Sequence, residues 1–325
     1  MSGSCLAVVI PCFRVKKQIL DVLAAIDGTV SLIFVVDDKC PEDTGDFVEA
    51  NCVDSRVTVV RHAFNQGVGG AVMTGYAAAI DAGAEIIVKI DGDGQMDPRL
   101  ISYFVEPIIK GEADYTKGNR FFFIDELRSM PTMRFLGNSV LSFVTKMSSG
   151  YWTLFDPTNG FTAIHANVAR LLPFASISKR YFFETDMLFR LNILRAVVVD
   201  IPMDAKYGDE QSNLRITGVM GEFAFKHLRN FAKRIVYSYY LRDLSLASFE
   251  LPIGLMMFFG GGAFGMYRWV SGVHVGAAAT AGTVMLAALP LLMGLQLILA
   301  FFGYDISSVP KRPIHSSLRR AKMRD

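Results

Sequence analysis

The residues of this chain best suited to chemistry are two aspartates, Asp91 and Asp93, which flank Gly92. They follow residues 86–90, a short apolar run whose β-branched side chains are typical of a buried strand. Side chains at positions i and i+2 of an extended segment point the same way, and the glycine between them allows a tight turn. Two carboxylates in an open loop suit Mg²⁺ or Mn²⁺ shared with a diphosphate. The spacing therefore predicts a metal–diphosphate site, and a loop of turn-forming residues is the alternative.

The segments around this loop alternate between apolar runs and helix-like stretches. Apolar runs occupy residues 6–10, 31–36, 57–61 and 85–90, and helical spacing occupies residues 17–26, 43–51 and 72–82. Continuous apolar runs are typical of a mainly parallel sheet that is covered by helices on both faces. We therefore expect a Rossmann-like α/β domain. In such domains ligands bind outside the carboxyl ends of the strands.

Four polar features fall at those strand ends: Pro11, Asp37-Asp38, Asn65–Gly70 and Asp91–Asp93. Their convergence on one edge of the sheet supports a ligand site more strongly than any single feature. A dinucleotide-binding fingerprint would follow the first strand, whereas the glycines at 67–70 follow the third, which disfavours a dehydrogenase. These glycines are expected to let the next helix pack closely on the sheet and to leave room for a ligand.

The composition narrows the classes of protein. The net charge of +2, without a basic stripe that carries aromatic residues, argues against nucleic-acid binding. The cysteines Cys5, Cys12, Cys40 and Cys52 lack metal-like spacing and are interpreted as reduced thiols of a cytosolic domain. The N-terminal apolar run is too short for a signal peptide and is interpreted as the first strand.

Two segments near the C-terminus, residues 251–270 and 275–303, are almost free of charge. Each is long enough to cross about 30 Å of hydrocarbon as a helix, the second one with a tilt. The connection at 271–274 is short, so we expect a helical hairpin; a hairpin buried in a soluble core is the alternative. The glycines 260, 261, 262 and 265 offer a small-residue face for close helix contact, within the hairpin or in a homo-oligomer.

Charge around these segments predicts their orientation. The cations before them are Lys226, Arg229, Lys233, Arg234 and Arg242, and those after them are Lys311, Arg312, Arg319, Arg320, Lys322 and Arg324. Only Arg268 lies near the connection, so both termini are expected on the cytoplasmic side.

These features divide the chain into four parts. We expect a catalytic domain at 1–220, an amphipathic helix at 221–243, two transmembrane helices within 244–305 and a basic cytoplasmic tail at 306–325. The amphipathic helix is expected to lie on the cytoplasmic bilayer surface, to pack on the domain, or both.

Several segments together resemble family-2 glycosyltransferases with the GT-A fold. Within that family the chain is similar to the polyprenyl-phosphate sugar synthases, of the dolichol-phosphate mannose and bacterial undecaprenyl-phosphate glucose types. The matching segments are Val9–Phe13, Val35–Asp38, Asn65–Ala71, Asp91–Pro98, Gly118–Arg120 and Asp156–Phe161. The resemblance covers the soluble part of the chain almost end to end.

The resemblance implies roles at the donor site. Pro11 and Phe13 would line the nucleobase pocket, and Asp37 and Asp38 would hold the base and ribose. The metal, Mg²⁺ or Mn²⁺, would be held with the diphosphate by Asp91, Asp93 and Gln95. The other residues implied at the nucleotide sugar are Asn65, Gly67, Gly70, Ala71, Gly92 and Arg215.

The resemblance also implies roles at the acceptor site. Arg120 and Arg134 match positions that meet the acceptor phosphate. The segment Glu184-Thr185-Asp186 lies where hydroxyl-acceptor relatives place a base, and Asp186 is the candidate within it. With Asp93, these residues are the catalytic candidates. The segment Asp156–Phe161 leaves Asp156 open between loop structure and the acceptor pocket.

The chain departs from the family pattern near the nucleobase. Phe13 replaces the usual tyrosine, Val15 the usual glutamate, and Lys39-Cys40 the usual Gly-Ser. Asn213 stands where the family has a lysine near the donor diphosphate, so Lys206 or Arg215 would supply that charge. These changes leave the donor base and sugar open.

The implied reaction is inverting transfer of a hexose from a UDP- or GDP-hexose to a polyprenyl phosphate, of the undecaprenyl type, at the cytoplasmic face of the inner membrane. A lipid phosphate needs no general base, because its second pKa is about 6, but it needs cations to hold it. The product would serve cell-surface glycan modification, with a flippase as a partner in the same pathway. The alternatives are transfer to a hydroxyl of a lipid-linked glycan and an inactive scaffold that binds sugar nucleotides.

Overall fold

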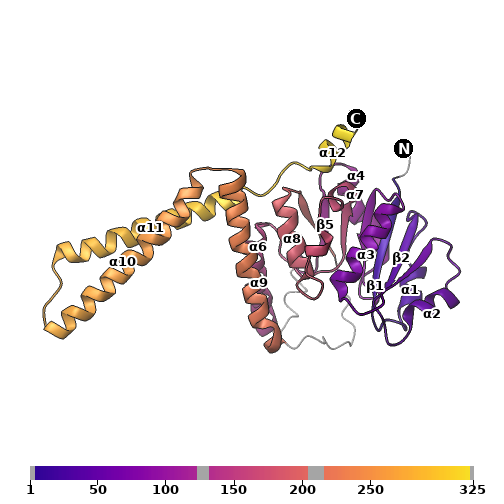
Figure 1. Ribbon diagram of the computed structural model, residues 1–325, viewed down its shortest axis with the longest axis horizontal. Coiled ribbons are helices and arrows are strands. Elements are labelled where there is room, and N and C mark those ends of the chain that lie inside the picture. Colours follow the sequence, from indigo (N-terminus) through magenta and orange to yellow (C-terminus); the bar gives the residue numbers. More distant parts are fainter. Residues whose placement is uncertain (1–3, 123–131, 204–215, 323–325) are drawn as a thin grey trace. The chain divides into compact units, whose positions relative to one another are not determined.

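The computed structural model describes residues 4–122, 132–203 and 216–322. The chain divides into two compact units (Figure 1). The α/β unit comprises Met1–Phe231 together with Pro310–Asp325, and the helical unit comprises Ala232–Val309. The residues predicted to form the site belong to the α/β unit.

One sheet forms the centre of the α/β unit, in the order β3-β2-β1-β4-β6-β5-β7. Its strands are β1 (Leu6–Cys12), β2 (Leu32–Asp37), β3 (Val57–Arg61), β4 (Ile86–Lys89), β5 (Tyr115–Asn119), β6 (Thr162–His165) and β7 (Val198–Pro202). The strand β6 is antiparallel to β4 and β5, and the other neighbouring pairs are parallel. The prediction of a mainly parallel sheet is confirmed.

Helices cover both faces of this sheet. The helices of the α/β unit are α1 (Ile19–Ala24), α2 (Thr44–Asn51), α3 (Val68–Asp81), α4 (Ile101–Ile109), α6 (Thr132–Ser149), α7 (Ala166–Ala169), α8 (Phe183–Ile193) and α12 (His315–Lys322), with short 3₁₀ turns η1 (Pro98–Leu100) and η2 (Phe174–Ser176). The helix α9 (Ile216–Val236) begins in this unit, and its last residues belong to the helical unit. Alternate strand residues point to opposite faces. Val8 joins one core cluster with Val22 of α1 and Phe104 of α4. Val9 on the other face meets Gly75 of α3, so both sides of the sheet are buried.

The helical unit contains the two predicted apolar segments. Its helices are α10 (Ala247–Val275) and α11 (Ala281–Ser307), drawn in orange and yellow in Figure 1, preceded by a π-helical turn, η3 (Tyr237–Arg242). Both helices are long and apolar enough to cross a membrane by length and composition. The helix α10 runs beyond the predicted 251–270 at both ends, whereas α11 begins later than the predicted residue 275 and ends beyond residue 303. The connection is therefore residues 276–280 and not 271–274.

Small residues bring α10 and α11 close together. A Cβ atom at Gly261 would lie 2.9 Å from the Ala287 carbonyl oxygen, and one at Gly294 would overlap the backbone of Phe258. A Cβ at Gly260 would meet nothing within 4 Å. Of the predicted small-residue face, Gly261 therefore lies in the helix contact, whereas Gly260 points away from it.

A buried ion pair closes the helical unit on itself. Both guanidinium NH groups of Arg234 donate to Asp305, at 2.6 and 3.0 Å, and the Tyr239 hydroxyl donates to the same carboxylate at 2.5 Å. The Arg234 and Asp305 side chains are 2% and 3% exposed. The start of this unit is thereby fixed to the end of α11, since breaking a buried pair is strongly unfavourable.

The helix α9 crosses the predicted boundary between residues 220 and 221 without a break. One side packs on the α/β unit, where His227 contacts the Ser148 hydroxyl at 2.8 Å and Asn230 donates to Asp186 at 3.2 Å. Its other side exposes large apolar residues such as Leu228. Packing on the domain is thus observed, and contact with a bilayer surface stays a prediction.

The predicted basic tail returns to the α/β unit. The backbone amides of Ile314 and His315 and the His315 Nδ1 donate to Asp114, which is fully buried. The His315 ring stacks on His165 with centroids 4.5 Å apart, and burial together with that neighbour lowers the pKa of His165 to about 4. Ile314 and His315 are therefore held by specific contacts that the charge of the tail did not indicate.

Candidate active site

A cavity of about 770 Å³ opens at the carboxyl edge of the sheet. The predicted residues on its wall are Pro11, Phe13, Asp38, Asn65, Gly67, Ala71, Asp91, Gly92 and Asp93. They come from the ends of β1, β2 and β4 and from the loop after β3, as expected for a parallel sheet. Residues to which no site role was assigned from the sequence complete the wall: Cys12, Val15, Lys39, Pro41, Val68, Lys89, Arg180, Tyr181 and Glu184.

The end of β4 carries the predicted metal ligands and a buried cation. Lys89 is 1% exposed, and its Nζ lies 2.7 Å from Asp91 Oδ1. Burial opposes the charge, yet Asp91 and Glu184 raise the pKa of Lys89 above its ordinary value. The turn that follows is closed by the backbone amide of Gln95, which donates to Asp93 Oδ1 at 3.0 Å. Gln95 itself is half-buried and is not among the cavity-lining residues.

The oxygen ligands on this wall suit a divalent metal. Asp91 and Asp93 line the same cavity as Glu184, and carboxylate oxygens are the ligands that Mg²⁺ and Mn²⁺ prefer. Among the described residues no group of three or more His, Cys, Asp or Glu forms a ready-made metal cage. Such an open donor set fits a metal whose remaining ligands come from a bound diphosphate and water.

Two carboxylates near the start of α8 have different surroundings. Glu184 lines the cavity, and burial raises its pKa. Asp186 is 1% exposed and accepts from the Ser178 amide, Arg190 Nε and Asn230 Nδ2. A catalytic role for Asp186 requires it to reach a substrate, but the structure commits its carboxylate to interior partners. The carboxylate that α8 presents to the cavity is Glu184.

Asp37 and Asp38 hold loops of the protein. Asp37 accepts from the amides of Cys40 and Gly45 at 2.7 and 2.6 Å and is not among the cavity-lining residues. Asp38 lines the cavity, but its two oxygens accept from the amides of Gln66 and Gly67, both at 2.7 Å. The expected contacts to base and ribose would therefore compete with these bonds, since each carboxylate has a limited number of acceptor sites.

The glycine loop receives a protein segment. The amides of Gly69 and Gly70 donate to the Lys179 carbonyl at 2.9 and 3.3 Å. A Cβ at Gly67, whose φ is +85°, would lie 2.5 Å from the same carbonyl oxygen. The space expected for a ligand is thus occupied in part by residues 178–181, which bring Arg180 and Tyr181 to the cavity wall. Gly70 supports this contact, and Ala71 faces the cavity.

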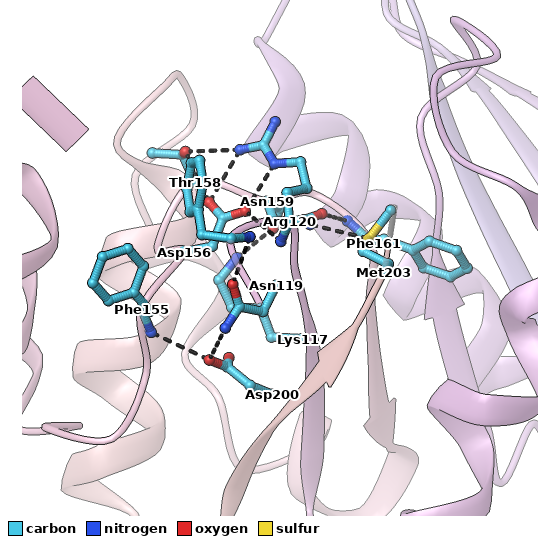
Figure 2. A network of polar contacts seen from close by, with 11 residues as sticks. Lys117, Asn119, Arg120, Phe155, Asp156, Thr158, Asn159, Phe161, Asp200 and Met203 are labelled. Atoms are coloured by element: carbon cyan, nitrogen blue, oxygen red, sulfur yellow. Dashed lines mark hydrogen bonds and ion pairs between the residues drawn. The ribbon is translucent and has the colours of Figure 1, made fainter. Parts of the chain in front are cut away.

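Arg120 belongs to a second polar cluster, shown in Figure 2. Its Nε and one terminal NH₂ lie 2.8 and 3.0 Å from the two oxygens of Asp156. Asp156 is fully buried, and although burial opposes ionisation, Arg120 holds the pKa of Asp156 below its usual range. The Arg120 side chain is 29% exposed and does not line the cavity described above. The sequence left the role of Asp156 open between loop structure and the acceptor pocket. In the structure, Asp156 fixes the guanidinium of Arg120.

Two further buried charges lie behind this pair. Burial lowers the pKa of Lys117 to about 8, and its ammonium donates to the Asn159 carbonyl. Burial also raises the pKa of Asp200 to about 6, and its Oδ2 accepts from Asn119 Nδ2 and the Phe155 amide at 3.1 and 3.2 Å (Figure 2). The cluster joins the ends of β5 and β7 to the loop before β6.

Two predicted arginines cannot be assigned contacts. Arg134 lies in the first turn of α6, and its side chain is outside the described residues. Arg215, expected near the donor diphosphate, also lies outside the described residues, as does Lys206.

Some wall residues gave a weak signal in the sequence, and others gave none. Lys89 interrupts an otherwise apolar run, which is a recognisable sign of a functional or paired charge in a strand. Arg180 and Tyr181 lie far along the chain from every strand end predicted for the site. Their position depends on how the segment docks on the glycine loop, which spacing alone does not predict.

A family model described as Glycosyl transferase family 2 matches residues 7–172 of the 325. A UDP-N-acetylglucosamine–dolichyl-phosphate N-acetylglucosaminyltransferase of Methanococcus voltae is 28% identical over 234 residues, which cover 68% of this chain and 92% of that protein. An undecaprenyl-phosphate mannosyltransferase of Micrococcus luteus is 28% identical over 192 residues, covering 58% and 78%.

Solved structures resemble the α/β unit. The glucosyl-3-phosphoglycerate synthase of Mycobacterium tuberculosis, solved in complex with Mn²⁺ and UDP, matches with a TM-score of 0.54 and 18% identity. The match covers 72% of this chain and 80% of that one. At this identity the likeness concerns the fold alone, which is the expected GT-A arrangement.

Proposed function

The chain belongs to glycosyl transferase family 2, and we propose that it transfers a sugar from a nucleotide diphosphate to the phosphate of a polyprenyl phosphate. The observation that carries this proposal is the cavity wall, where Asp91 and Asp93 face the same space as Lys89 and Arg180. Such a mixture of hard oxygen ligands and cations suits a diphosphate. The names of the relatives support a polyprenyl-phosphate acceptor.

The donor half of the reaction needs charge on the leaving diphosphate to be neutralised. When bound, Mg²⁺ or Mn²⁺ would act there as a Lewis acid. Asp91 and Asp93 would hold the metal, and Arg180 would place a guanidinium beside the phosphates. Pro11 and Phe13 would border the nucleobase. The proposed donor is a UDP- or GDP-hexose, so this base would be uracil or guanine.

The acceptor half needs cations to hold the nucleophile. A phosphate oxygen attacks without deprotonation near neutral pH, because the second pKa of a phosphomonoester is about 6. Arg120 is suited to this task, since Asp156 fixes its guanidinium and leaves the side chain partly exposed. Arg134 is proposed as its companion. Attack from the face opposite the diphosphate would invert the anomeric centre.

A second candidate function is supported by Glu184. A carboxyl on the cavity wall with a raised pKa has the properties of a general base, which a hydroxyl acceptor requires. Transfer to a hydroxyl of a lipid-linked glycan is therefore the alternative. With a phosphate acceptor, Glu184 would position ligands.

The helical unit supports a membrane location for this reaction. Both apolar helices are proposed to span the inner membrane, and the flanking cations favour a cytoplasmic location for the α/β unit and both termini. A polyprenyl phosphate keeps its headgroup at that interface. The enzyme would then meet its acceptor by diffusion in two dimensions. We propose a homo-oligomer and a flippase that acts on the product as its partners.

The test is direct transfer with the purified full-length protein. It would be incubated with Mn²⁺, undecaprenyl phosphate and, in turn, UDP-glucose, UDP-N-acetylglucosamine and GDP-mannose. We expect an alkali-stable, acid-labile lipid-linked sugar with at least one donor, and no product from Asp91→Asn or Asp93→Asn. If no donor yields such a lipid, the proposal fails. An inactive scaffold would bind nucleotides yet neither hydrolyse nor transfer the sugar.

A further inference from the structure

The donor cavity has a cation built into its wall at Lys89. This side chain is 1% exposed, and its ammonium contacts Asp91 Oδ1 at 2.7 Å. Lys89 is the last residue of β4 and Asp91 follows two positions later, and the contact shows that the two side chains lie on the same side of the chain. A proposed metal ligand is therefore already paired with a positive charge of the protein.

A second segment preserves this pair. Gly160, just before β6, lies so close that a Cβ atom there would overlap Lys89 Nζ and approach Asp91 Oδ2 to 2.5 Å. Any larger residue would displace the ammonium or the carboxylate. Two chain segments thus leave just enough space for the pair, which distinguishes it from a surface contact.

The charges around the pair predict how a metal would bind. Asp91, Asp93 and Glu184 supply three carboxylates to the wall, and Lys89 offsets one of them. A divalent cation bound to Asp91 would face the ammonium across the same carboxylate, and like charges at that range repel. A nucleotide diphosphate adds negative charge that both cations attract, so its arrival removes the penalty.

We propose that Lys89 makes metal binding depend on the nucleotide diphosphate: the metal binds weakly alone and tightly only with the donor. This rests on the proposed function, in which Asp91 and Asp93 hold a metal at a nucleotide sugar. Lys89 is here a positioning residue that acts through Asp91. Its fixed charge, and no change of its protonation, produces the effect.

The experiment measures Mn²⁺ affinity without any turnover. Free Mn²⁺ would be followed by electron paramagnetic resonance during titration of the full-length protein, alone and with saturating UDP or GDP. The Mn²⁺ that the nucleotide binds by itself would be measured without protein and subtracted. The wild type is expected to bind Mn²⁺ at least roughly tenfold more tightly with one nucleotide, as removal of one unit of repulsion implies. Lys89→Met is expected to bind Mn²⁺ about tenfold more tightly without nucleotide, so its nucleotide dependence should be about tenfold smaller than that of the wild type.

A matched control separates this effect from the loss of any buried lysine. Lys117 is also 1% exposed but does not line the cavity, so Lys117→Met is expected to keep the wild-type Mn²⁺ affinities. Gly160→Ala keeps the charge of Lys89 while pushing it from Asp91, and should shift Mn²⁺ affinity in the same direction as Lys89→Met. This variant decides the question if Lys89→Met does not fold.

The outcomes are distinguishable. Unchanged or weaker Mn²⁺ binding without nucleotide, in a folded Lys89→Met or Gly160→Ala protein, would overturn the role of Lys89 and leave the proposed function standing. Equal Mn²⁺ affinity of the wild type with and without nucleotide would likewise overturn the role of Lys89 and leave the proposed function standing. A wild type that binds no Mn²⁺ even with UDP or GDP would overturn the metal-dependent function as well.

Discussion

Glu184 and Asp186 show how two residues decide where chemistry is available. They are two positions apart on α8, a spacing that directs side chains to different sides of a helix. Glu184 consequently faces the cavity, whereas Asp186 is surrounded by Arg190, Asn230 and the Ser178 amide. The carboxylate of Glu184 is therefore available to a ligand, whereas that of Asp186 stabilises the fold.

Exchanging each carboxylate for its amide tests this distinction. With a phosphate acceptor, we expect Glu184→Gln to lower turnover by less than about tenfold, because no general base is required. Asp186→Asn should lower Tm, since it weakens the contacts to Arg190 and Asn230, while leaving the substrate KM values near wild type. Steady-state kinetics and thermal unfolding of both variants provide the comparison. A loss of about 10²-fold or more in Glu184→Gln would favour a hydroxyl acceptor.

The stability of the protein should depend on pH through Asp200. Burial raises the pKa of this carboxyl to about 6, so the group stabilises the fold while it is protonated. That contribution is complete below the unfolded value near 4 and is lost as the pH rises through about 6, at a cost on the order of 3 kcal/mol. Asp200→Asn does not ionise and keeps an oxygen for its two donors. We expect its Tm to match wild type at pH 4 and to exceed it by several degrees at pH 8.

A control of opposite sign accompanies the Asp200 variant. Hydrogen bonds from Arg56 lower the pKa of Asp54, so Asp54→Asn should lose stability at pH 8 and little at low pH. Scanning fluorimetry at several pH values compares the two variants. Equal Tm differences for Asp200→Asn at pH 4 and pH 8 would contradict the expected loss of stability on ionisation.

Sequence reasoning was most successful where chemistry and strand ends coincide. Asp91, Asp93 and Pro11 lie on the cavity wall because the end of a parallel strand is a fixed place in this fold. Asp37 was predicted to contact the nucleotide for the same reason, but its carboxylate accepts hydrogen bonds from the backbone amides of Cys40 and Gly45. Local hydrogen bonding of this kind depends on the loop conformation, which residue types alone do not determine.

At the scale of elements, the contact between the glycine loop and residues 178–181 shapes the donor cavity. Gly67 and Gly69 admit the carbonyl groups of this segment, and the segment then carries Arg180 and Tyr181 to the wall. A loop that was expected to leave room for a ligand is thus a docking point for another segment of the protein. Its effect on a ligand is indirect, through the position of Arg180.

Gly67→Ala tests this docking contact. The added methyl would meet the Lys179 carbonyl, so residues 178–181 must shift and take Arg180 with them. We expect a rise in the donor KM of about tenfold or more, as the loss of one charged hydrogen bond implies. Gly83→Ala is the control, because Gly83 has a similar φ of +86° but nothing within 4 Å. Backbone strain should cost Gly83→Ala about 1 kcal/mol of stability, and Gly67→Ala more, because its φ of 85° and ψ of 166° lie in a region that is essentially restricted to glycine. An unchanged donor KM in Gly67→Ala would exclude this role.

The loop before β6 and the end of β5 form the proposed acceptor side. Asp156→Asn would remove the charged half of the contact with Arg120, so the guanidinium would lose its fixed orientation. We expect the KM for polyprenyl phosphate to rise by about tenfold while the Kd for nucleotide stays near wild type. Asp54→Asn, which disrupts a comparable Arg–Asp pair elsewhere, serves as the control. If only nucleotide binding weakened, the acceptor assignment would be wrong.

The later strands show why part of the fold could not be predicted. β5 contains Lys117 and Asn119, and β6 begins with Thr162, so neither presents the continuous apolar run that marks β1 or β4. Lys117 and Asn119 are buried in the cluster of Figure 2, where partners from distant segments satisfy them, and Thr162 is buried as well. Tertiary contacts of this kind override local patterns.

At the scale of the whole molecule, the existence of the helical hairpin could be predicted from the sequence, whereas several long-range contacts could not. The helical hairpin was predictable because a segment of this length without charge is typical of a helix that spans a bilayer. The ends of its helices could not be predicted. They depend on capping by Thr280 and on the bond between Arg234 and Asp305, and both contacts form only in the folded protein. The return of His315 to Asp114 has no sequence signal at all, because it joins residues 201 positions apart.

The central claim is that the acceptor group is a lipid phosphate. It is tested most directly by offering undecaprenyl phosphate and undecaprenol, which share one lipid chain, to the full-length protein with Mn²⁺ and its active nucleotide sugar. We predict an acid-labile sugar phosphate on the first lipid, no product on the second, and loss of the product in Arg120→Met. Transfer to undecaprenol at a comparable rate, or only to a hydroxyl of an added lipid-linked glycan, would contradict the claim.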